Sequence, residues 1–321
     1  MDCSPPLRQP LKRSLSIRIQ VIIPSRCRPE AASRCLAALS RQTLDHSSFE
    51  VLLVDDGSPE PLKVDTRGLP PSFRFRIVHQ QHSGPAVARE FGARCSQAGI
   101  LLFTDDDCVP APDWVETLSR AVEAHPHAMV GGHTRNGAHT NRQARVNQLI
   151  LDLVYQHFNP PGRPATFFAS NNVGCRRADF LEVGGFDPDF PLPAAEDRDL
   201  CDRWRQRGWP LVHAPEALVE HHHSQTVTQF LRMYFRYGRG ARILHEKRRS
   251  RGARGVRDDL GFHEGIPARL GAHFQNTPLS ERILVVALLL GWETANAVGF
   301  FWETFFGGRT PASTVPERRV S

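Results

Sequence analysis

The sequence has no Cys-x-x-Cys pair, although it contains seven cysteines. Their odd number and scattered positions argue against a zinc ribbon and a disulfide framework, and favour a reducing compartment. Residues 1–16 contain prolines and charges but no apolar run of the kind that a signal peptide requires, so we expect a disordered tail there. No internal repeat is evident along the chain.

The length and hydrophobic content of the chain are sufficient for a substantial core. The chain has 321 residues and a hydrophobic content of 40%, which suits one large α/β domain or two modest ones. Its formal net charge of +6 permits an anionic partner, such as a nucleotide, phospholipid head groups or nucleic acid, without choosing among them.

Apolar runs and amphipathic segments alternate along the first part of the chain. Short apolar runs at 18–24, 49–58, 75–80 and 99–107 predict strands, and helical spacing at 29–42 and 83–98 predicts helices between them. Asp113 is the expected cap of a third helix. This alternation predicts a parallel sheet with both faces covered by helices.

The second half has a less regular pattern. We expect helices at 142–158 and 195–208, a strand at 128–134, and a strand-turn-helix unit that ends in the Gly-Gly turn before Asp187. Residues 209–223 are interpreted as paired strands leading to a run of histidines.

Two acidic clusters follow predicted strands. Asp55 and Asp56 end the second strand, and Asp105, Asp106 and Asp107 end the fourth. Because ligands bind beyond the carboxyl ends of strands in an open parallel sheet, both clusters should face one crevice. The ordinary alternatives are a turn for the first cluster and helix capping before Trp114 for the second. The functional interpretation is a hard divalent cation, since Mg²⁺ and Mn²⁺ take oxygen ligands.

Three further groups have both an ordinary and a functional interpretation. Arg89 is either a solvated arginine or, near a helix N-terminus, a ligand for an anion. Glu196 and Asp197 either complement a helix dipole or supply a general base. The consecutive histidines at 221–223 form either an exposed strand end or a set in which one residue joins a metal. Adjacent strand residues alternate faces, so all three cannot easily bind one ion.

The ordered series of motifs from residue 17 to residue 241 resembles the family-two glycosyltransferases with a GT-A fold. The matching segments are "VIIPSRCRPEAASRCLAALSRQTL", "FEVLLVDDGS", "SGPAVAREFGA", "LLFTDDDCVPAPDW", "SNNVGCRRADFLEVGGFD", "AEDRDL" and "VEHHHS…QFLRMYFRYGRGA". The resemblance implies a mixed, mostly parallel sheet flanked by helices. It also implies inverting transfer of a sugar from a nucleotide-diphosphate sugar to a hydroxyl of a glycan, lipid or small molecule, with Mn²⁺ or Mg²⁺.

The resemblance also implies roles for individual residues. Pro24, Ser25 and Asp56 would line the nucleobase pocket, with Asp55 beside it. Arg89 would lie near the base and the diphosphate. Asp105 would help to hold the ribose or the metal. Asp107 would be the metal ligand of the DxD motif, and Asn172 and the turn at 184–187 would shape the sugar and acceptor side. Asp197 would be the catalytic base, with Glu196 as the alternative. His221 best fits the late metal ligand, with His222 and His223 as alternatives.

Two other functions compete with this one. A sugar-1-phosphate nucleotidyltransferase would need a glycine-rich basic loop after the first strand, and "PSRCRPE" contains no glycine. A non-catalytic carbohydrate-binding protein with a degenerate site would not need so complete a set of acids. A processive polymerase of the family would show a Gln-x-x-Arg-Trp motif and several membrane spans, so a single-addition enzyme is expected.

Residues 242–321 are expected to form a basic linker and an apolar helical region. Residues 283–306 are long enough to cross a bilayer, but Glu293 and Asn296 argue against a clean span. With Glu303 they could form one polar stripe on an interfacial helix, and the basic residues at 236–257 could attract anionic lipid. The alternative is a helix that packs in the core or on a partner. We expect a cytoplasmic protein at the inner face of the cell membrane, and no nucleic-acid partner because aromatic residues are sparse in the basic region.

Overall fold

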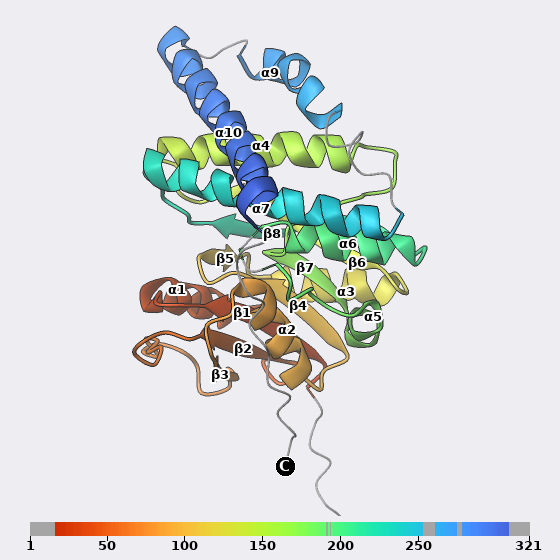
Figure 1. Ribbon diagram of the computed structural model, residues 1–321. Helices are drawn as coiled ribbons and strands as arrows, with labels where there is room; N and C mark the ends of the chain where they lie inside the picture. Colours follow the sequence, from red (N-terminus) through yellow and green to blue (C-terminus); the bar gives the residue numbers. More distant parts are fainter. Residues whose placement is uncertain (1–16, 191, 193, 253–260, 275–277, 308–321) are drawn as a thin grey trace, which may run out of the picture.

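The computed structural model describes residues 17–190, 192, 194–252, 261–274 and 278–307 (Figure 1). The tail expected at 1–16 lies outside the described residues.

One eight-stranded sheet organises the described chain, in the order β3-β2-β1-β4-β7-β6-β8-β5. Strands β1 (Ile19–Ser25), β2 (Phe49–Asp56), β3 (Phe75–Gln80) and β4 (Ile100–Thr104) are parallel. Strand β7 (Asn172–Arg176) is antiparallel to β4 and to β6 (Met129–Asn136). Strand β8 (Leu211–His221) runs parallel to β6, and β5 (Cys108–Pro110) is antiparallel to β8. The predicted mixed, mostly parallel sheet is confirmed.

Helices cover both faces of this sheet because its central strands are apolar on both sides. Val21 and Ile23 of β1 pack into one core with α1 (Pro29–Leu39) and α3 (Trp114–Ala124). Ile22, between them, packs into the opposite core with α2 (Pro85–Cys95), α5 (Arg177–Val183) and α6 (Glu196–Gln206). Side chains that alternate along a strand therefore fill two separate cores.

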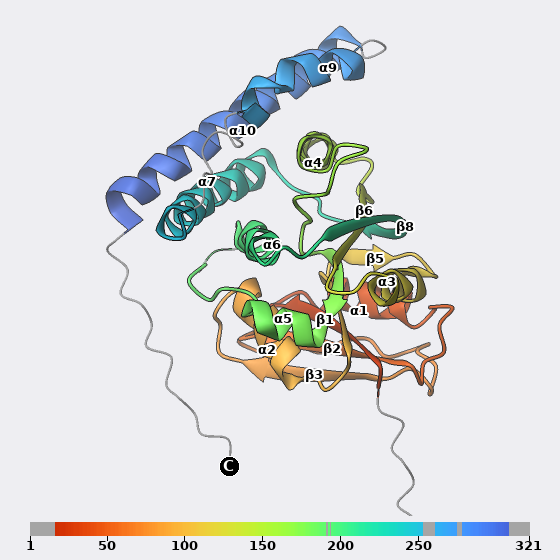
Figure 2. The ribbon, with the colours of Figure 1, turned by 90° about the vertical axis from the view of Figure 1, so that its right-hand side faces the viewer.

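A third core joins four helices outside the sheet layers. It contains apolar residues of α4 (Arg142–Phe158), α7 (Val227–Ser250), α9 (Ile266–Phe274) and α10 (Leu279–Phe306). Figure 2 shows α10 on the far side of α4 and α7 from the sheet. Glycines allow α7 and α10 to cross closely. A Cβ on Gly238 would lie 2.0 Å from the Asn296 carbonyl oxygen, and one on Gly299 would lie 2.0 Å from that of Phe235.

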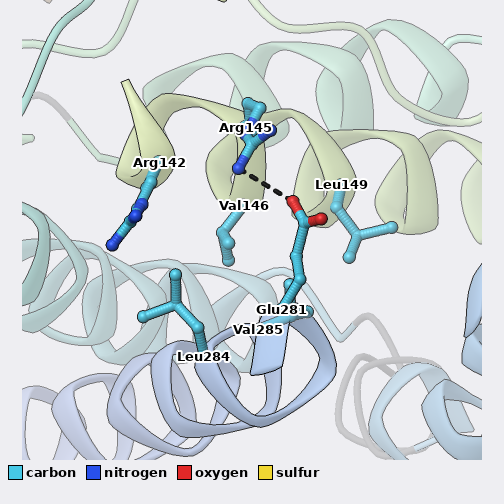
Figure 3. Close-up of a pocket in the computed structure, with 7 residues that line it drawn as sticks. All are labelled: Arg142, Arg145, Val146, Leu149, Glu281, Leu284 and Val285. Carbon is cyan, nitrogen blue, oxygen red and sulfur yellow. Dashed lines mark ion pairs between the residues drawn. The ribbon is translucent and has the colours of Figure 1, made fainter. Parts of the chain in front are cut away.

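The seam between α4 and α10 is incompletely filled. A cavity of about 240 Å³ lies there beside the ion pair between Arg145 and Glu281, which measures 2.8 Å (Figure 3). Arg142 and apolar side chains of both helices form the rest of its wall, the apolar ones being Val146, Leu149, Leu284 and Val285. The ion pair therefore fixes the beginning of α10 against α4.

The basic residues of α7 are mostly paired within the protein. Their ion pairs are Arg239–Glu303, Arg242–Glu246, Lys247–Asp187, Arg248–Asp202 and Arg251–Asp199. Four of these pairs join α7, or the residue after it, to other segments. These described cations serve internal docking, and Arg254 and Arg257 lie outside the described residues, so the attraction of this region to anionic lipid stays a prediction.

The polar stripe expected on α10 exists, and it faces the protein. Glu303 pairs with Arg239 at 2.6 Å, Glu293 lies 2.7 Å from Nδ1 of His263, and Asn296 abuts Gly238. The opposite side of α10 carries most of the large apolar side chains that are exposed among the described residues: Leu279, Ile283, Val286, Leu290, Val298, Phe301, Trp302, Phe305 and Phe306.

Two sequence-based details were wrong. Residues 211–221 form the single strand β8 rather than paired strands. The register between β6 and β8 shifts where Gly131 pairs with His213 and His133 pairs with Leu218, so exposed Pro215 lies in a bulge. The acidic cluster does not cap the next helix, because β5 separates it from α3 and Asp113 occupies the N-cap position.

Candidate active site

The carboxyl ends of β1, β2 and β4 meet at one edge of the sheet, where a cavity of about 1020 Å³ opens. Most of the residues selected from the sequence line it: Pro24, Ser25, Asp56, Arg89, Asp105, Glu196, Asp197 and His221. Asp55, Asp107 and Asn172 are not among its lining residues. The two acidic clusters therefore face one crevice, as the strand order predicts.

Asp55 is buried beside the cavity and organises the loop after β2. Its carboxylate accepts hydrogen bonds from the N–H groups of Ser58 at 3.0 Å and Leu62 at 3.1 Å, and Nδ1 of His79 lies 3.0 Å away. Burial alone would raise the pKa of Asp55, but the hydrogen bonds from Ser58 and its neighbours hold that pKa below the ordinary value. Asp55 thus holds the loop after β2 in place beside Asp56.

Asp56 ties the end of β2 to the beginning of α2. One oxygen accepts from Nε2 of Gln80 at 2.7 Å and the N–H of Ser83 at 2.8 Å. The other accepts from the N–H of Gly84 at 2.9 Å and lies 2.8 Å from Nδ1 of His82. A ligand that reaches Asp56 must share or displace one of these four groups.

Arg89 bridges the end of β4 and the start of α6. Its buried guanidinium donates to Asp105 Oδ1 at 2.5 Å and to Glu196 Oε1 at 3.3 Å. Burial would lower the pKa of Arg89, but the carboxylates of Asp105 and Glu196 raise it overall. Its Nε is buried and has no hydrogen-bond partner. The arginine therefore connects the two acidic walls of the cavity.

Glu196 and Asp197 begin α6 directly after Ala195, whose backbone is left-handed with φ 68°. Burial, and then the charge of Asp197, raise the pKa of Glu196 to about 7. Burial also raises the pKa of Asp197, although its Oδ1 accepts from the Arg198 N–H at 2.8 Å. A carboxylate whose pKa is raised toward neutrality suits general-base work.

Asp106 and Asp107 share one arginine. Nη1 of Arg28 lies 2.7 Å from Asp107 Oδ2, and Nη2 lies 3.3 Å from Asp106 Oδ1. Asp106 is buried and accepts from Oγ of Ser25 at 2.7 Å, and burial raises its pKa to about 7. Burial opposes ionisation of Asp107 too, but hydrogen bonds with His221 and His223 hold its pKa well below the ordinary value.

The three histidines alternate as the strand geometry predicts. Nε2 of His221 lies 3.2 Å from Asp107 Oδ1, and Nδ1 of His223 lies 3.0 Å from Oδ2, with the two rings stacked 5.4 Å apart. His222 points elsewhere, with Nε2 3.4 Å from Glu220. Two histidines, and not one, therefore reach Asp107.

Asp107, Cys108 and His221 have ligand atoms within 4.8 Å of one another. Burial raises the pKa of the Cys108 thiol far above the ordinary value, which leaves an oxygen and a nitrogen as the available donors. This set, beside a buried Asp106 oxygen that lacks a hydrogen bond, fits Mn²⁺ or Mg²⁺. Asp105, also selected as a metal ligand, lies outside the group because its carboxylate is paired with Arg89.

Asn172 has a place in the core rather than in the cavity. It accepts from Nε1 of Trp114 at 2.8 Å and donates to the carbonyl oxygens of His133 at 3.0 Å and Ala217 at 2.9 Å. The asparagine that lines the cavity is its neighbour Asn171. The expectation that Asn172 shapes the sugar and acceptor side is therefore wrong, because its amide is used within the core, and Asn171, directly before β7, is the one that faces the cavity.

The turn at 184–187 also lies outside the cavity lining and anchors neighbouring helices. Glu90 of α2 accepts from the Phe186 N–H at 3.0 Å, and Lys247 of α7 lies 2.7 Å from Asp187. Sequence reasoning missed Arg28 and Asn171, and it named His223 only as an alternative to His221. Each lies within three residues of a position that was selected, so the motifs located the right segments without showing which side chain turns inward.

Comparisons with known proteins agree with this geometry. The family model described as Glycosyl transferase family 2 matches residues 20–184, which is more than half of the chain. The chain belongs to this family. It is 32% identical over 229 residues to glycosyltransferase AglE of Haloferax volcanii, covering 69% of this chain and 72% of that protein. Membership argues against the nucleotidyltransferase alternative.

Other relatives in the family have longer chains. Validoxylamine A glucosyltransferase of Streptomyces hygroscopicus subsp. limoneus is 28% identical over 242 residues, covering 65% of this chain and 52% of that protein. Pre-mycofactocin glycosyltransferase of Mycobacterium tuberculosis is 28% identical over 231 residues, covering 70% of this chain and 47% of that protein. The chain spans about half the length of these two relatives.

Solved structures of low sequence identity share the fold. The mannosyltransferase PcManGT of Pyrobaculum calidifontis, solved with GDP-Man and Mn²⁺, has a TM-score of 0.60 at 18% identity, covering 91% of this chain and 88% of that one. Residues 1–349 of Staphylococcus aureus TarS give a TM-score of 0.50 at 14% identity, covering 87% and 80%. These similarities support the GT-A fold.

Proposed function

We propose that this protein is an inverting glycosyltransferase that moves a sugar from a nucleotide-diphosphate sugar to a hydroxyl acceptor. One observation carries the proposal. Asp197 lines the same cavity as Asp56 and Asp105, which stand at the carboxyl ends of two strands. The solved mannosyltransferase of similar fold binds a nucleotide sugar and Mn²⁺, which supports the same donor class here.

The donor would lie along the strand ends. Pro24, Ser25 and Asp56 would contact the nucleobase, and Asp105 the ribose, because all four line the cavity at this edge. Asp107 and His221 would hold a divalent cation, which when bound supplies positive charge to the departing diphosphate. Arg89 adds a fixed positive charge between the two walls and keeps Asp105 oriented.

Asp197 would act on the acceptor. Its carboxylate takes the proton of the acceptor hydroxyl while that oxygen forms a bond to the anomeric carbon. The bond to the diphosphate breaks on the opposite face, so one displacement inverts the configuration. Glu196 is the weaker candidate, since Arg89 lies 3.3 Å from its carboxylate and competes for it.

We also propose that the protein lies at the inner face of the cell membrane through α10. This helix is the described helix that is long and apolar enough to cross a membrane by length and composition, and only 28% of its most apolar window is buried. Because its polar stripe pairs with α7 and His263, the geometry favours a helix lying in the interface over a span.

Isothermal titration with UDP-, GDP- and dTDP-sugars, with and without Mn²⁺, tests the donor class. We expect one of them to bind at one site per chain with an affinity that Mn²⁺ increases. Failure of every nucleotide sugar to bind under either condition would refute the proposal.

A further inference from the structure

The large cavity continues past the carboxylates into the helical layer. Its distant walls come from Leu151 and Val154 of α4, Tyr237 of α7, and Trp292, Ala297 and Phe301 of α10. At about 1020 Å³ it reaches the upper end of the range for a site that holds one drug-sized ligand, roughly 300–1,000 Å³. The cavity therefore has room for a second ligand beyond the carboxylate edge.

The chemistry of the lining changes along the cavity. The edge near the strand ends carries Asp56, Arg89, Asp105 and Asp197, whereas aliphatic and aromatic side chains dominate the helical end. Polar side chains also line the helical end, namely Asn147, Tyr234, Arg236, His245, His263, Glu293 and Asn296. Two pairs of them are hydrogen-bonded to each other. Oδ1 of Asn147 accepts from the Tyr234 hydroxyl at 2.5 Å, and Glu293 lies 2.7 Å from His263. Because these groups already have hydrogen-bond partners, they do not require a polar ligand to satisfy them.

The apolar end is continuous with the outer surface of α10. Ala297 and Phe301 line the cavity, and both are also exposed, Phe301 to 58%. Four residues apart, they lie on one side of the helix. Val298 and Phe305, exposed on the same stretch, extend this surface outside the cavity. An apolar chain could thus pass from the cavity to the outer face of α10 without crossing a charged group on this helix.

Tyr237 marks the junction of the two ends. It is 42% exposed, opens onto the cavity, and packs edge-on against Tyr234 at 5.4 Å between ring centroids. Shielding within the cavity, and then the carboxylates of Asp197 and Glu196, raise the pKa of its hydroxyl. Tyr237 thus places an apolar ring and a neutral hydroxyl between the carboxylate pair and the apolar wall. Such a side chain suits the point where the polar head of a ligand meets its apolar tail.

We infer that the acceptor is amphipathic, with a hydroxyl-bearing head at Asp197 and a hydrocarbon tail that follows the apolar end and leaves past Ala297 and Phe301. This inference rests on the proposed function. A fully polar acceptor would leave the apolar wall exposed to water. A hydrocarbon tail would bury that wall, which stabilises the complex by about 25 cal/mol per Å² of apolar surface. The tail would emerge on the side of α10 that we place at the membrane.

Calorimetry with octyl, decyl and dodecyl maltoside below their critical micelle concentrations tests the apolar subsite in the full chain. We expect one molecule to bind per chain, with Kd falling about tenfold for each added pair of methylenes. Ala297→Glu and Leu151→Ser, on opposite walls, should each weaken binding of dodecyl maltoside at least tenfold. Circular dichroism checks that each variant folds. If one variant is misfolded, the other still tests the inference.

Leu290→Glu is the matched control, because Leu290 is 64% exposed on α10 and is not among the lining residues. It should leave the maltoside affinity unchanged. Absence of binding, affinity independent of tail length, or loss of binding in Leu290→Glu alone would overturn the inference. If maltosides bind but no nucleotide sugar does, the proposed function falls and the apolar subsite stands. If only nucleotide sugars bind, the reverse holds.

Discussion

Nη1 of Arg28 lies 2.7 Å from Oδ2 of Asp107, the same oxygen that Nδ1 of His223 approaches at 3.0 Å. The proposed metal ligand is therefore already neutralised by side chains of its own chain. Arg28 precedes α1 and its side chain is 47% exposed, so it can withdraw without disturbing the core. The backbone strain of this turn lies at the preceding residue, Cys27, which is left-handed with φ 56°.

Replacing this arginine should strengthen metal binding. In Arg28→Gln a competing cation is removed, so we expect Mn²⁺ affinity without donor to rise about fivefold, the scale of a partly exposed ion pair. Electron paramagnetic resonance of free Mn²⁺ measures this directly. Arg26→Gln is the control, since Arg26 also lines the cavity but its Nε donates a long hydrogen bond, of 3.4 Å, to the Gly57 carbonyl instead of approaching Asp107. Unchanged or weaker Mn²⁺ binding in Arg28→Gln would show that the arginine does not compete.

Removing the carboxylate itself should have the opposite effect. Asp107→Ala should abolish the metal-dependent part of donor binding, because Asp107 is the one carboxylate in the ligand group formed with His221. Titration of the nucleotide sugar with and without Mn²⁺ measures this part. His222→Ala is the control, since His222 points away toward Glu220. An Mn²⁺ enhancement equal to that of the unmodified protein would refute the role of Asp107.

Loss of the proposed base should separate binding from chemistry. Asp197→Asn should keep donor affinity within about twofold and lower kcat by about 10²–10⁴. Glu196→Gln should lose less activity if Asp197 is the base, and more if the two roles are exchanged. Near-normal turnover in Asp197→Asn would place the base elsewhere.

The rate should also depend on pH in a defined direction. Burial raises the pKa of Asp197, so a larger fraction of it is protonated, and inactive as a base, as the pH falls. We expect kcat to decline as the pH is lowered, starting at a higher pH than an ordinary aspartate would give, and the residual activity of Asp197→Asn to lose this decline. A flat profile for the unmodified protein would contradict the assignment.

The crossing of α7 and α10 should be sensitive to a single methyl group. A Cβ on Gly238 would lie 2.0 Å from the Asn296 carbonyl oxygen, so Gly238→Ala must separate the helices and should lower Tm by several degrees. Gly271→Ala, in α9 with no heavy atom within 4 Å of the added Cβ, should leave Tm equal or slightly higher. Thermal unfolding followed by circular dichroism compares the two. Equal Tm values would mean that the close crossing does not form.

Membrane association should depend on the apolar face of α10. Replacing Leu290 and Phe305 together by glutamate should shift the protein from the pellet to the supernatant in co-sedimentation with vesicles of phosphatidylethanolamine and phosphatidylglycerol. Because most described cations of α7 are paired internally, raising the salt concentration should weaken binding only slightly. Binding that disappears at high salt, or that survives the double substitution, would contradict an apolar contact through α10.

The sequence was most informative where one segment alone decides the structure. Apolar runs that end in carboxylates located β2 and β4, and parallel strands bring their ends to one edge, so Asp56 and Asp105 could be placed in a common crevice. Helical spacing likewise located α4 and α6. These features depend on local patterns and on the strand geometry.

Features that depend on distant partners could not be predicted. The pairing of Arg28 with Asp107 joins residues 79 positions apart, and neither sequence segment signals the other. Whether Asn171 or Asn172 turns toward the cavity depends on where β7 begins, and sequence patterns do not fix that boundary to one residue. The direction of the polar stripe on α10 depends on α7, more than 50 residues earlier in the chain.

The stereochemistry of sugar release tests the central claim most directly. With the nucleotide sugar that binds best and water as the acceptor, proton NMR at early times distinguishes the anomers before they interconvert. For an α-linked donor, a single displacement with Asp197 as base predicts that the β-anomer forms first. Initial release of the α-anomer would contradict the account.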